Sequence, residues 1–228
     1  MKIGINVWYL TLLLASIAGF CDTITFVAAD RIFSAHVTGN FIVFAYDVVT
    51  ASDASAWVKL LTLPVFIISV MAAGWLMRKK LNRYVLLLSE SILLIAGGLI
   101  ALGFKLYGAV DLQWPVYLVV MLVVFAMGLQ NAFGRIFGKE THGPTTMMTG
   151  NVTQASLDIS NFFSSKFKDG ESRLSLKKLG VNIGGFLAGC LLGAILGKQV
   201  GLAAVALPGL ALAYCHLIAD PSAALPGK

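Results

Sequence analysis

Apolar segments of nearly membrane-spanning length recur along this chain, and they constrain its fold more than any other feature. Several approach the roughly 20 residues that an α-helix needs to cross a bilayer. The sequence is 58% hydrophobic and 12% charged, whereas soluble domains carry about 25% charged residues. We therefore expect an all-α transmembrane protein embedded in a lipid bilayer. The apolar segments are residues 7–20, 57–77, 84–104, 116–129, 179–196 and 201–218.

The charged residues and the cysteines exclude several other classes of protein. The formal net charge of +6 comes from Lys and Arg in a few short loops, without the aromatic-interleaved basic patch of a nucleic-acid-binding surface. We therefore expect no nucleic acid as a partner. Cys21, Cys190 and Cys215 lie in or beside apolar segments, and none belongs to a CxxC or His-rich pattern. They are typical of small buried residues, so we expect neither a metal site nor a cofactor.

A short polar motif occurs twice and divides the chain into two similar halves. The letters TGN stand at 38–40 and again at 149–151, and a carboxylate, Asp47 or Asp158, follows each copy at the same distance. Weaker matches on both sides extend the similarity to a repeat of about 110 residues. We expect a single membrane domain over 1–228, with repeats at about 1–108 and 109–228.

Charges in the connecting loops indicate that the two halves have opposite orientations in the membrane. The connection after the first TGN segment, TASDAS, is acidic or neutral, whereas its counterpart in the second half is basic. The next pair of connections reverses this pattern, with Lys198 alone in the second half. Positive residues favour the cytoplasmic side, so we expect inverted repeats with both termini in the cytoplasm. The basic clusters are Lys166, Lys168, Arg173, Lys177 and Lys178, and in the other half Arg78, Lys79, Lys80 and Arg83.

Inverted halves require an odd number of crossings, although each half contains four apolar or amphipathic segments. The segment from Thr38 to Thr50 has about 13 residues, or roughly 20 Å of helix against about 30 Å of hydrocarbon. We therefore expect six membrane-crossing helices and two short or re-entrant helices, one at each TGN motif. An irregular stretch is expected before each short helix, at 22–37 and 131–148.

The TGN motifs are candidate binding sites because a helix that begins inside a membrane has unpaired N–H groups. Thr38 and Thr149 are suitable N-cap residues, the glycines permit close approach, and the asparagines bring amides to the first turn. The positive end of the helix dipole favours a polar or anionic group. The alternative is that TGN only starts a helix. The candidate substrate-binding residues are Asp22, Thr38, Gly39, Asn40, Gln130, Asn131, Thr149, Gly150 and Asn151.

Five titratable residues are candidates for proton coupling. Asp22 is expected to end an apolar helix, where a carboxylate opposes the helix dipole, and its alternative role is a salt bridge to Arg31. Asp47 and Asp158 lie two turns after the TGN asparagines, so each could carry a proton, meet a basic partner or lie near the membrane surface. Glu90 is expected to face the interior or a partner subunit. The candidates are Asp22, His36, Asp47, Glu90 and Asp158.

Small residues at four-residue spacings near the end of the chain predict close helix packing. They occur in the segment GGFLAGCLLGAILG at 184–197, and such spacings let helix backbones approach one another. The neighbouring helix could belong to the same chain or to another copy. A homodimer is a reasonable expectation for a membrane chain of this size.

The motifs AGFCDTITF, HVTGNF and GLQNAFGRIFG…TTMMTGNVT resemble those of the YoaK-like family of bacterial inner-membrane proteins. The resemblance extends over nearly the full chain. It implies a multi-pass protein of the bacterial inner membrane with about six helices. The family is of unknown function, so the resemblance implies no substrate.

Three kinds of function remain for a chain with these features. The leading expectation is a secondary transporter, permease or channel for a small polar or anionic molecule of unknown identity, with proton coupling through Asp22. An intramembrane enzyme using Asp22 with His36 is a weaker alternative, because the sequence has no GxSxG, HExxH or P-loop motif, and we expect no enzyme. The third reading is a membrane scaffold or accessory subunit whose polar motifs are structural.

Overall fold

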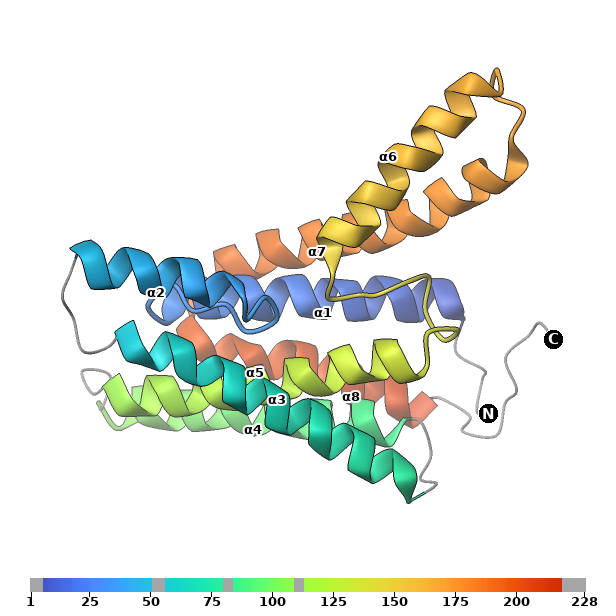
Figure 1. Ribbon diagram of the computed structural model, residues 1–228. Coiled ribbons are helices and arrows are strands. Elements are labelled where there is room, and N and C mark those ends of the chain that lie inside the picture. Colours follow the sequence, from blue (N-terminus) through green and yellow to red (C-terminus); the bar gives the residue numbers. More distant parts are fainter. Residues whose placement is uncertain (1–5, 51–55, 80–83, 109–112, 219–228) are drawn as a thin grey trace.

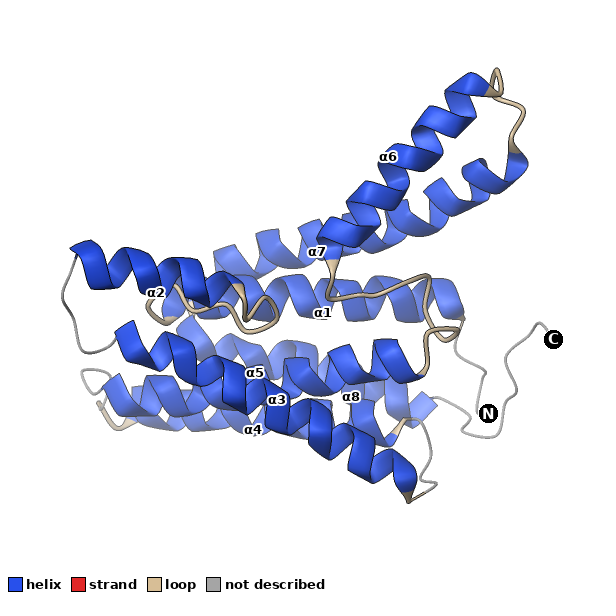
Figure 2. Cartoon of the chain, viewed as in Figure 1, coloured by secondary structure: helices blue, strands red, loops and turns tan. Residues whose placement is uncertain are grey.

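The computed structural model describes residues 6–50, 56–79, 84–108 and 113–218, and the regular structure in this part of the chain is entirely helical (Figure 2). Most of the TASDAS connection, together with Lys80 and Arg83, lies outside the described residues. The helices are α1 (Val7–Ala28), α2 (Gly39–Thr50), α3 (Ala56–Arg78), α4 (Val85–Leu106), α5 (Gln113–Ile136), α6 (Met148–Ser164), α7 (Gly170–Gln199), the 3-10 helix η2 (Gly201–Val205) and α8 (Ala206–Ile218).

Five of the described helices are long and apolar enough to cross a membrane: α1, α3, α4, α5 and α7. The expected all-α membrane class is therefore confirmed. The sixth expected crossing, at 201–218, consists of η2 and α8 and belongs to the shorter apolar helices. With a rise of about 2.0 Å per residue in its 3-10 part and 1.5 Å in its α part, it extends roughly 30 Å, which is the thickness of the hydrocarbon core. Its role as a crossing stays a prediction.

The first helix of each half runs further than predicted, and this corrects the positions of Asp22 and Asn131. α1 continues to Ala28, so Asp22 lies inside this helix and does not end it. α5 continues to Ile136 and includes Asn131. No Gly or Pro lies between Asp22 and the end of α1, and the Thr25 hydroxyl bonds back into its own helix, so nothing interrupts the helix there. The irregular stretches are shorter than expected, at 29–38 and 137–147.

The two halves of the chain interlock in the bundle. α1 packs along α7, and α3 packs along α5, so the first helix of each half contacts the third helix of the other. The fourth helices, α4 and α8, pack against each other. Figure 1 shows that each helix of α1–α4 runs opposite to its counterpart in α5–α8. This is the arrangement expected for inverted repeats, and their orientation in a membrane stays a prediction.

The small residues of α7 make the contact with α1. A Cβ atom at Gly193 would lie 2.6 Å from the carbonyl oxygen of Phe20, and one at Gly189 would collide with the carbonyl oxygen of Ser16. Gly184, in contrast, has no neighbour within 4 Å of the Cβ position and faces away from this contact. The glycines that recur every four residues from Gly185 therefore face α1 of the same chain, and α1 is the neighbouring helix that the glycine spacing predicted.

The two short helices lie differently against the bundle. α2 has 12 residues and packs against α3, whereas α6 has 17 residues and packs against α7. Their lengths of roughly 18 and 26 Å are both below about 30 Å. α6 and the beginning of α7 project from the bundle as a hairpin (Figure 1). The apolar pattern did not predict this hairpin, because the first nine residues of α7 are mostly polar.

Candidate functional site

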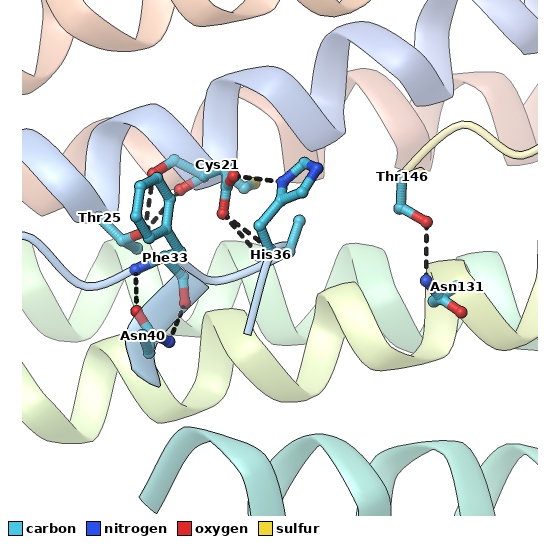
Figure 3. Close-up of polar contacts among 9 residues, drawn as sticks. Cys21, Thr25, Phe33, His36, Asn40, Asn131 and Thr146 are labelled. Atoms are coloured by element: carbon cyan, nitrogen blue, oxygen red, sulfur yellow. Dashed lines mark hydrogen bonds and ion pairs between the residues drawn. The ribbon is translucent and has the colours of Figure 1, made fainter. Parts of the chain in front are cut away.

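The loop before α2 folds back beside α1, and Asp22 holds it there. Oδ1 of Asp22 accepts hydrogen bonds from the backbone N–H groups of Ala35 at 2.7 Å and His36 at 3.2 Å. Its Oδ2 lies 2.6 Å from Nδ1 of the His36 ring. Asp22 is buried, so one carboxylate with three partners fixes the chain shortly before the first TGN motif. Figure 3 shows the side chain of His36 in one of these contacts. The alternative salt bridge from Asp22 to Arg31 is wrong, because Arg31 binds Asp47.

His36 is the one titratable partner of Asp22 in this loop contact. The hydrogen bond to the Asp22 carboxylate raises the pKa of the His36 imidazole, while partial burial of the ring opposes that rise. The side chain of His36 is 36% exposed, and its ring lies edge-on to Phe186 of α7 with centroids 5.6 Å apart. The ring can therefore exchange a proton while its Nδ1 stays on the buried carboxylate.

Asn40 of the first TGN motif connects the loop, α2 and α3. Its Oδ1 accepts a hydrogen bond from the N–H of Phe33 at 2.8 Å. Its Nδ2 donates to the carbonyl oxygen of Phe33 at 2.8 Å and to the Thr62 hydroxyl at 2.9 Å. Asn40 is fully buried, and both of its amide N–H bonds have partners within the protein. Figure 3 shows the two contacts with Phe33.

Gln130 and Asn131 of α5 hold the loop before α6 in the equivalent way. Nε2 of Gln130 donates to the carbonyl oxygen of Leu14 at 2.7 Å and to the Thr145 hydroxyl at 2.9 Å. Nδ2 of Asn131 donates to the Thr146 hydroxyl at 2.8 Å (Figure 3). Thr146 precedes its TGN asparagine by the same number of residues as Ala35 precedes Asn40. Asp22 and Asn131 therefore bind matching points of the two loops.

Asn151 of the second TGN motif repeats only part of the Asn40 contact. Its Nδ2 donates to the carbonyl oxygen of Pro144 at 2.8 Å, and Nδ2 of Asn182 in α7 donates to the same oxygen at 3.0 Å. Pro144 precedes Asn151 by seven residues, as Phe33 precedes Asn40. Because proline has no backbone N–H, the return bond to the asparagine oxygen is missing in the second half.

Three buried polar atoms around this second loop have no hydrogen-bond partner within the described part of the chain. They are Oε1 of Gln130, Nε2 of His142 and Oδ1 of Asn182. A buried polar atom without a partner costs about 1–3 kcal/mol, and such atoms commonly bind a ligand or water. Burial, together with the positive charge of Lys178, lowers the pKa of the His142 ring and favours its neutral form. The second loop thus has more unused capacity for hydrogen bonding than the first loop, where Oγ of Ser34 is the one buried polar side-chain atom without a partner in the described residues.

Lys59 of α3 is a buried partner of Asp47 that sequence reasoning missed. Its Nζ lies 2.8 Å from Oδ2 of Asp47 and 2.9 Å from Oδ2 of Asp30, and Nη2 of Arg31 donates to Oδ1 of Asp47 at 2.7 Å. Lys59 is fully buried. Among the roles left open for Asp47, the structure gives it basic partners. A lysine in the first turns of an apolar helix is the signal that could have identified this network.

Asp158 has a different environment from Asp47. Its Oδ1 accepts from Nε2 of Gln154 at 2.9 Å, and its Oδ2 accepts from the Ser175 hydroxyl of α7 at 2.5 Å. These two hydrogen-bond partners are neutral, although Asp158 is buried, with 6% of its surface exposed. The two repeat-related carboxylates join their short helices to the following helix by different chemistry.

The remaining TGN residues do not play equal roles in the two halves. Thr38 directly precedes α2, and a Cβ atom at Gly39 would lie 3.1 Å from the ring of Phe33. Thr149 lies inside α6, whose N-cap position is Met147, so the N-cap prediction for Thr149 is wrong. Gly150 has no neighbour within 4 Å of its Cβ position, so no other backbone of the described residues approaches it closely, and the approach of a ligand there stays a prediction.

Glu90 of α4 lies apart from the loops and faces the interior, as expected. It is fully buried, and both of its carboxylate oxygens have no hydrogen-bond partner within the described residues. The described part of the chain contains no group of three or more His, Cys, Asp or Glu side chains arranged to hold a metal ion.

The helical bundle and its five long apolar helices define a multi-pass membrane protein. The chain belongs to the family described as protein of unknown function (DUF1275), whose model matches residues 10–218. This confirms membership in a family of unknown function over nearly the full chain. Comparisons with curated proteins and with solved structures found no match.

Proposed function

We propose that this protein is a secondary transporter or permease, or a channel of the same architecture, for a small polar molecule in the bacterial inner membrane. The observation that carries the proposal is the pair of loops that fold back beside α1 and α5 before the two short helices. Transporters with inverted repeats bind substrate where such broken segments meet near the membrane midplane. The proposal has both termini in the cytoplasm and assigns no enzymatic activity.

The loop before α6 is the better candidate for contact with the substrate. Oε1 of Gln130 and Oδ1 of Asn182 are buried acceptors without a donor in the described residues. A substrate with N–H or O–H groups would satisfy both acceptors, whereas a bare anion would not. In the first half, the amide N–H bonds of Asn40 already have partners. Substrate binding is therefore proposed to be asymmetric, with Asn151 and Asn182 near the ligand.

The Asp22–His36 pair is proposed as the site of proton coupling. When His36 is protonated, its ring and the carboxylate of Asp22 form an ion pair at 2.6 Å. Loss of the proton removes that charge and weakens the hold of α1 on the loop before α2. Proton exchange at the partly exposed ring would thus be linked to the position of a loop beside the proposed site.

Ligand-dependent thermal stabilisation of the purified protein tests the binding site. Amino acids, nucleobases, sugars and small anions are screened at two pH values, and a hit is then tested for uptake into proteoliposomes. We expect Asn182→Ala to abolish the rise in Tm caused by the hit. The control is Ser156→Ala on α6, whose exposed hydroxyl donates to the carbonyl oxygen of Val152 in the same helix. No hit in the whole screen, or a hit unaffected by Asn182→Ala, contradicts the proposed site.

A second candidate function is a membrane scaffold or accessory subunit, and the contacts of Asn40 favour it. A TGN asparagine whose amide joins the Phe33 backbone to Thr62 serves the fold directly. A partner that copurifies in fixed stoichiometry, together with no uptake of any screened molecule, would favour this candidate over transport.

A further inference from the structure

A cavity of about 270 Å³ lies at one end of the bundle, away from the two loops. It forms where the ends of α1, α4 and α7 meet the beginning of α5 and the 3-10 helix η2. Most of its wall is apolar. Small-molecule pockets have volumes of roughly 300–1,000 Å³, so this cavity has room for part of a ligand rather than for a large one. The main apolar lining residues are Ala28, Ala101, Phe104, Val116, Val119 and Leu202.

Two lysines from different helices line this cavity. Lys105 lies in the last turn of α4, and Lys198 lies in the last turn of α7. Nζ of Lys105 also donates to the carbonyl oxygen of Val200, at a long distance of 3.4 Å. No acidic side chain is among the described residues that line the cavity. The cavity therefore combines two positive charges with an apolar wall.

The ends of the surrounding helices place this cavity at the boundary between membrane and water. α4 and α7 are candidate membrane spans, and each ends within one residue of its lysine. α7 stops before Gly201, whose φ of +76° turns the chain into η2 and leaves backbone of residues 199–203 along the cavity. At this depth, lysine side chains meet lipid headgroups while apolar residues meet acyl chains.

The ordinary role of a lysine near a helix C-terminus is to offset the negative end of the helix dipole. That role needs only one lysine for each helix and no particular neighbour. It does not account for two lysines from separate helices that line a single cavity with an apolar wall.

From this combination we propose that the cavity binds an anionic phospholipid, with its phosphate between Lys105 and Lys198 and the beginning of an acyl chain against Phe104 and Val116. The shared chemistry is a phosphate group, which could also come from a free phosphate ion. The apolar wall favours phosphate carried on an acyl chain. This inference is independent of the proposed transport function, because none of the cavity residues belongs to the loops or the TGN motifs.

Thermal unfolding of the delipidated full-length protein tests the proposal with three probes: phosphatidylglycerol, phosphatidylcholine and inorganic phosphate. We expect phosphatidylglycerol to raise Tm and the other two to have little effect. Lys105→Gln/Lys198→Gln should weaken apparent affinity for phosphatidylglycerol about 30-fold, because each lysine near an anionic lipid contributes about fivefold. The matched control is Lys168→Gln/Lys177→Gln, which removes two exposed lysines from the α6–α7 hairpin.

Several outcomes would overturn the proposal. Equal stabilisation by phosphatidylcholine would mean that charge does not select the lipid, and equal stabilisation by inorganic phosphate would mean a site for a free anion. An equal loss of affinity in the control variant would assign the effect to general surface charge. If the Lys105/Lys198 variant does not fold, native mass spectrometry of the wild type decides. Equal retention of phosphatidylglycerol and phosphatidylcholine in that experiment contradicts the proposal. The proposal is supported if the protein retains phosphatidylglycerol preferentially and the Lys105→Arg/Lys198→Arg variant does so too.

Discussion

Asp22 and Asn131 bind equivalent loops with opposite hydrogen-bond polarity. Asp22 accepts from backbone N–H groups, whereas the Asn131 amide donates to the Thr146 hydroxyl. The charged member of the pair is also the one that meets a titratable residue, because Met147 replaces His36 in the second half. At these matched positions, protonation can therefore act on the Asp22 contact without acting on the contact between Asn131 and Thr146.

Stability should depend on pH through His36. The pKa of His36 is raised from 6.5 in the folded protein, so its contribution is fully present below pH 6.5 and is lost as pH rises through the higher folded-state value. We expect Tm to fall as pH increases across that window. His36→Gln should flatten this part of the profile, which a series of thermal melts between pH 5.5 and 9 would measure. An unchanged slope in the variant would show that His36 is not the group responsible.

The negatively charged form of Glu90 should not be required for folding. An isolated buried carboxylate has a large desolvation cost, and Glu90→Gln removes the charge with little change in volume. We expect the variant to keep or increase its Tm in detergent. A Tm lower by several degrees would mean that the charged form has a partner that stabilises it. Comparison of ligand-driven proton uptake in proteoliposomes then separates a coupling role from a structural one.

At the level of single residues, the sequence identified the polar residues that hold the two loops. It identified fewer of the partners that these residues bind. Asp22, Asn40, Gln130 and Asn131 stand out because polar residues are rare near apolar segments. Several of their partners are backbone groups, such as those of Phe33 and Ala35, which any residue carries. The extent of α1 beyond Asp22 was also missed, because a carboxylate that receives hydrogen bonds from a returning loop does not need to end a helix.

At the level of helices, α7 carries glycines with two different surroundings. Gly193→Ala should separate α7 from α1, because the new Cβ would lie 2.6 Å from the Phe20 carbonyl oxygen. Gly184→Ala meets nothing within 4 Å and gains helix propensity worth about 1 kcal/mol. We expect Tm to fall by several degrees for Gly193→Ala and to stay equal or rise for Gly184→Ala. A similar change in both variants would contradict the α1–α7 contact.

The ion pairs of Lys59 join α3 to Asp47 of α2 and to Asp30 in the loop before α2. Lys59→Met would leave the buried Asp47 with Arg31 as its basic partner, and removing one member of a buried pair typically costs about 3–5 kcal/mol. We expect a clearly lower midpoint of thermal unfolding. The control is Lys177→Met, because Lys177 is exposed on α7. Equal midpoints for the two variants would mean that the network adds nothing to stability.

Helix lengths were predicted well where apolar residues set them and poorly where polar residues continued the helix. α3 and α4 nearly coincide with the apolar segments 57–77 and 84–104. α7 begins nine residues before the apolar segment at 179, since Asp169 accepts hydrogen bonds from the N–H groups of Glu171 and Ser172. That capping pattern was visible in the letters DGES, but it carries no hydropathy signal.

For the whole molecule, the predicted topology can be tested by labelling single cysteines in intact cells. Lys79 directly follows the end of α3 and Tyr107 directly follows the end of α4, and both residues are exposed. After replacement of the three native cysteines, Tyr107→Cys should react with a membrane-impermeant maleimide. Lys79→Cys should react only after permeabilisation, because positive loops stay in the cytoplasm. The reverse pattern would show that the predicted orientation is wrong.

The repeat was visible in the sequence, but the pairing of its helices was not. Matching motifs such as TGN show which positions are equivalent, without showing whether α1 packs within its own half. The exchange of contacts between halves depends on surfaces such as the glycines of α7, which fit the backbone of α1 around Ser16 and Phe20.

The pairing of α1 with α7 also sets an order for assembly during synthesis. Roughly 140 residues separate the end of α1 from the beginning of α7. At a synthesis rate of about 5–20 residues per second, the beginning of α7 is therefore made roughly 7–28 s after the end of α1. During that time the surface around Ser16 and Phe20 faces lipid or the insertion machinery, with Asp22 on the same helix. The nascent first half is thus an incomplete unit, because the main packing partner of α1 lies in the last third of the chain.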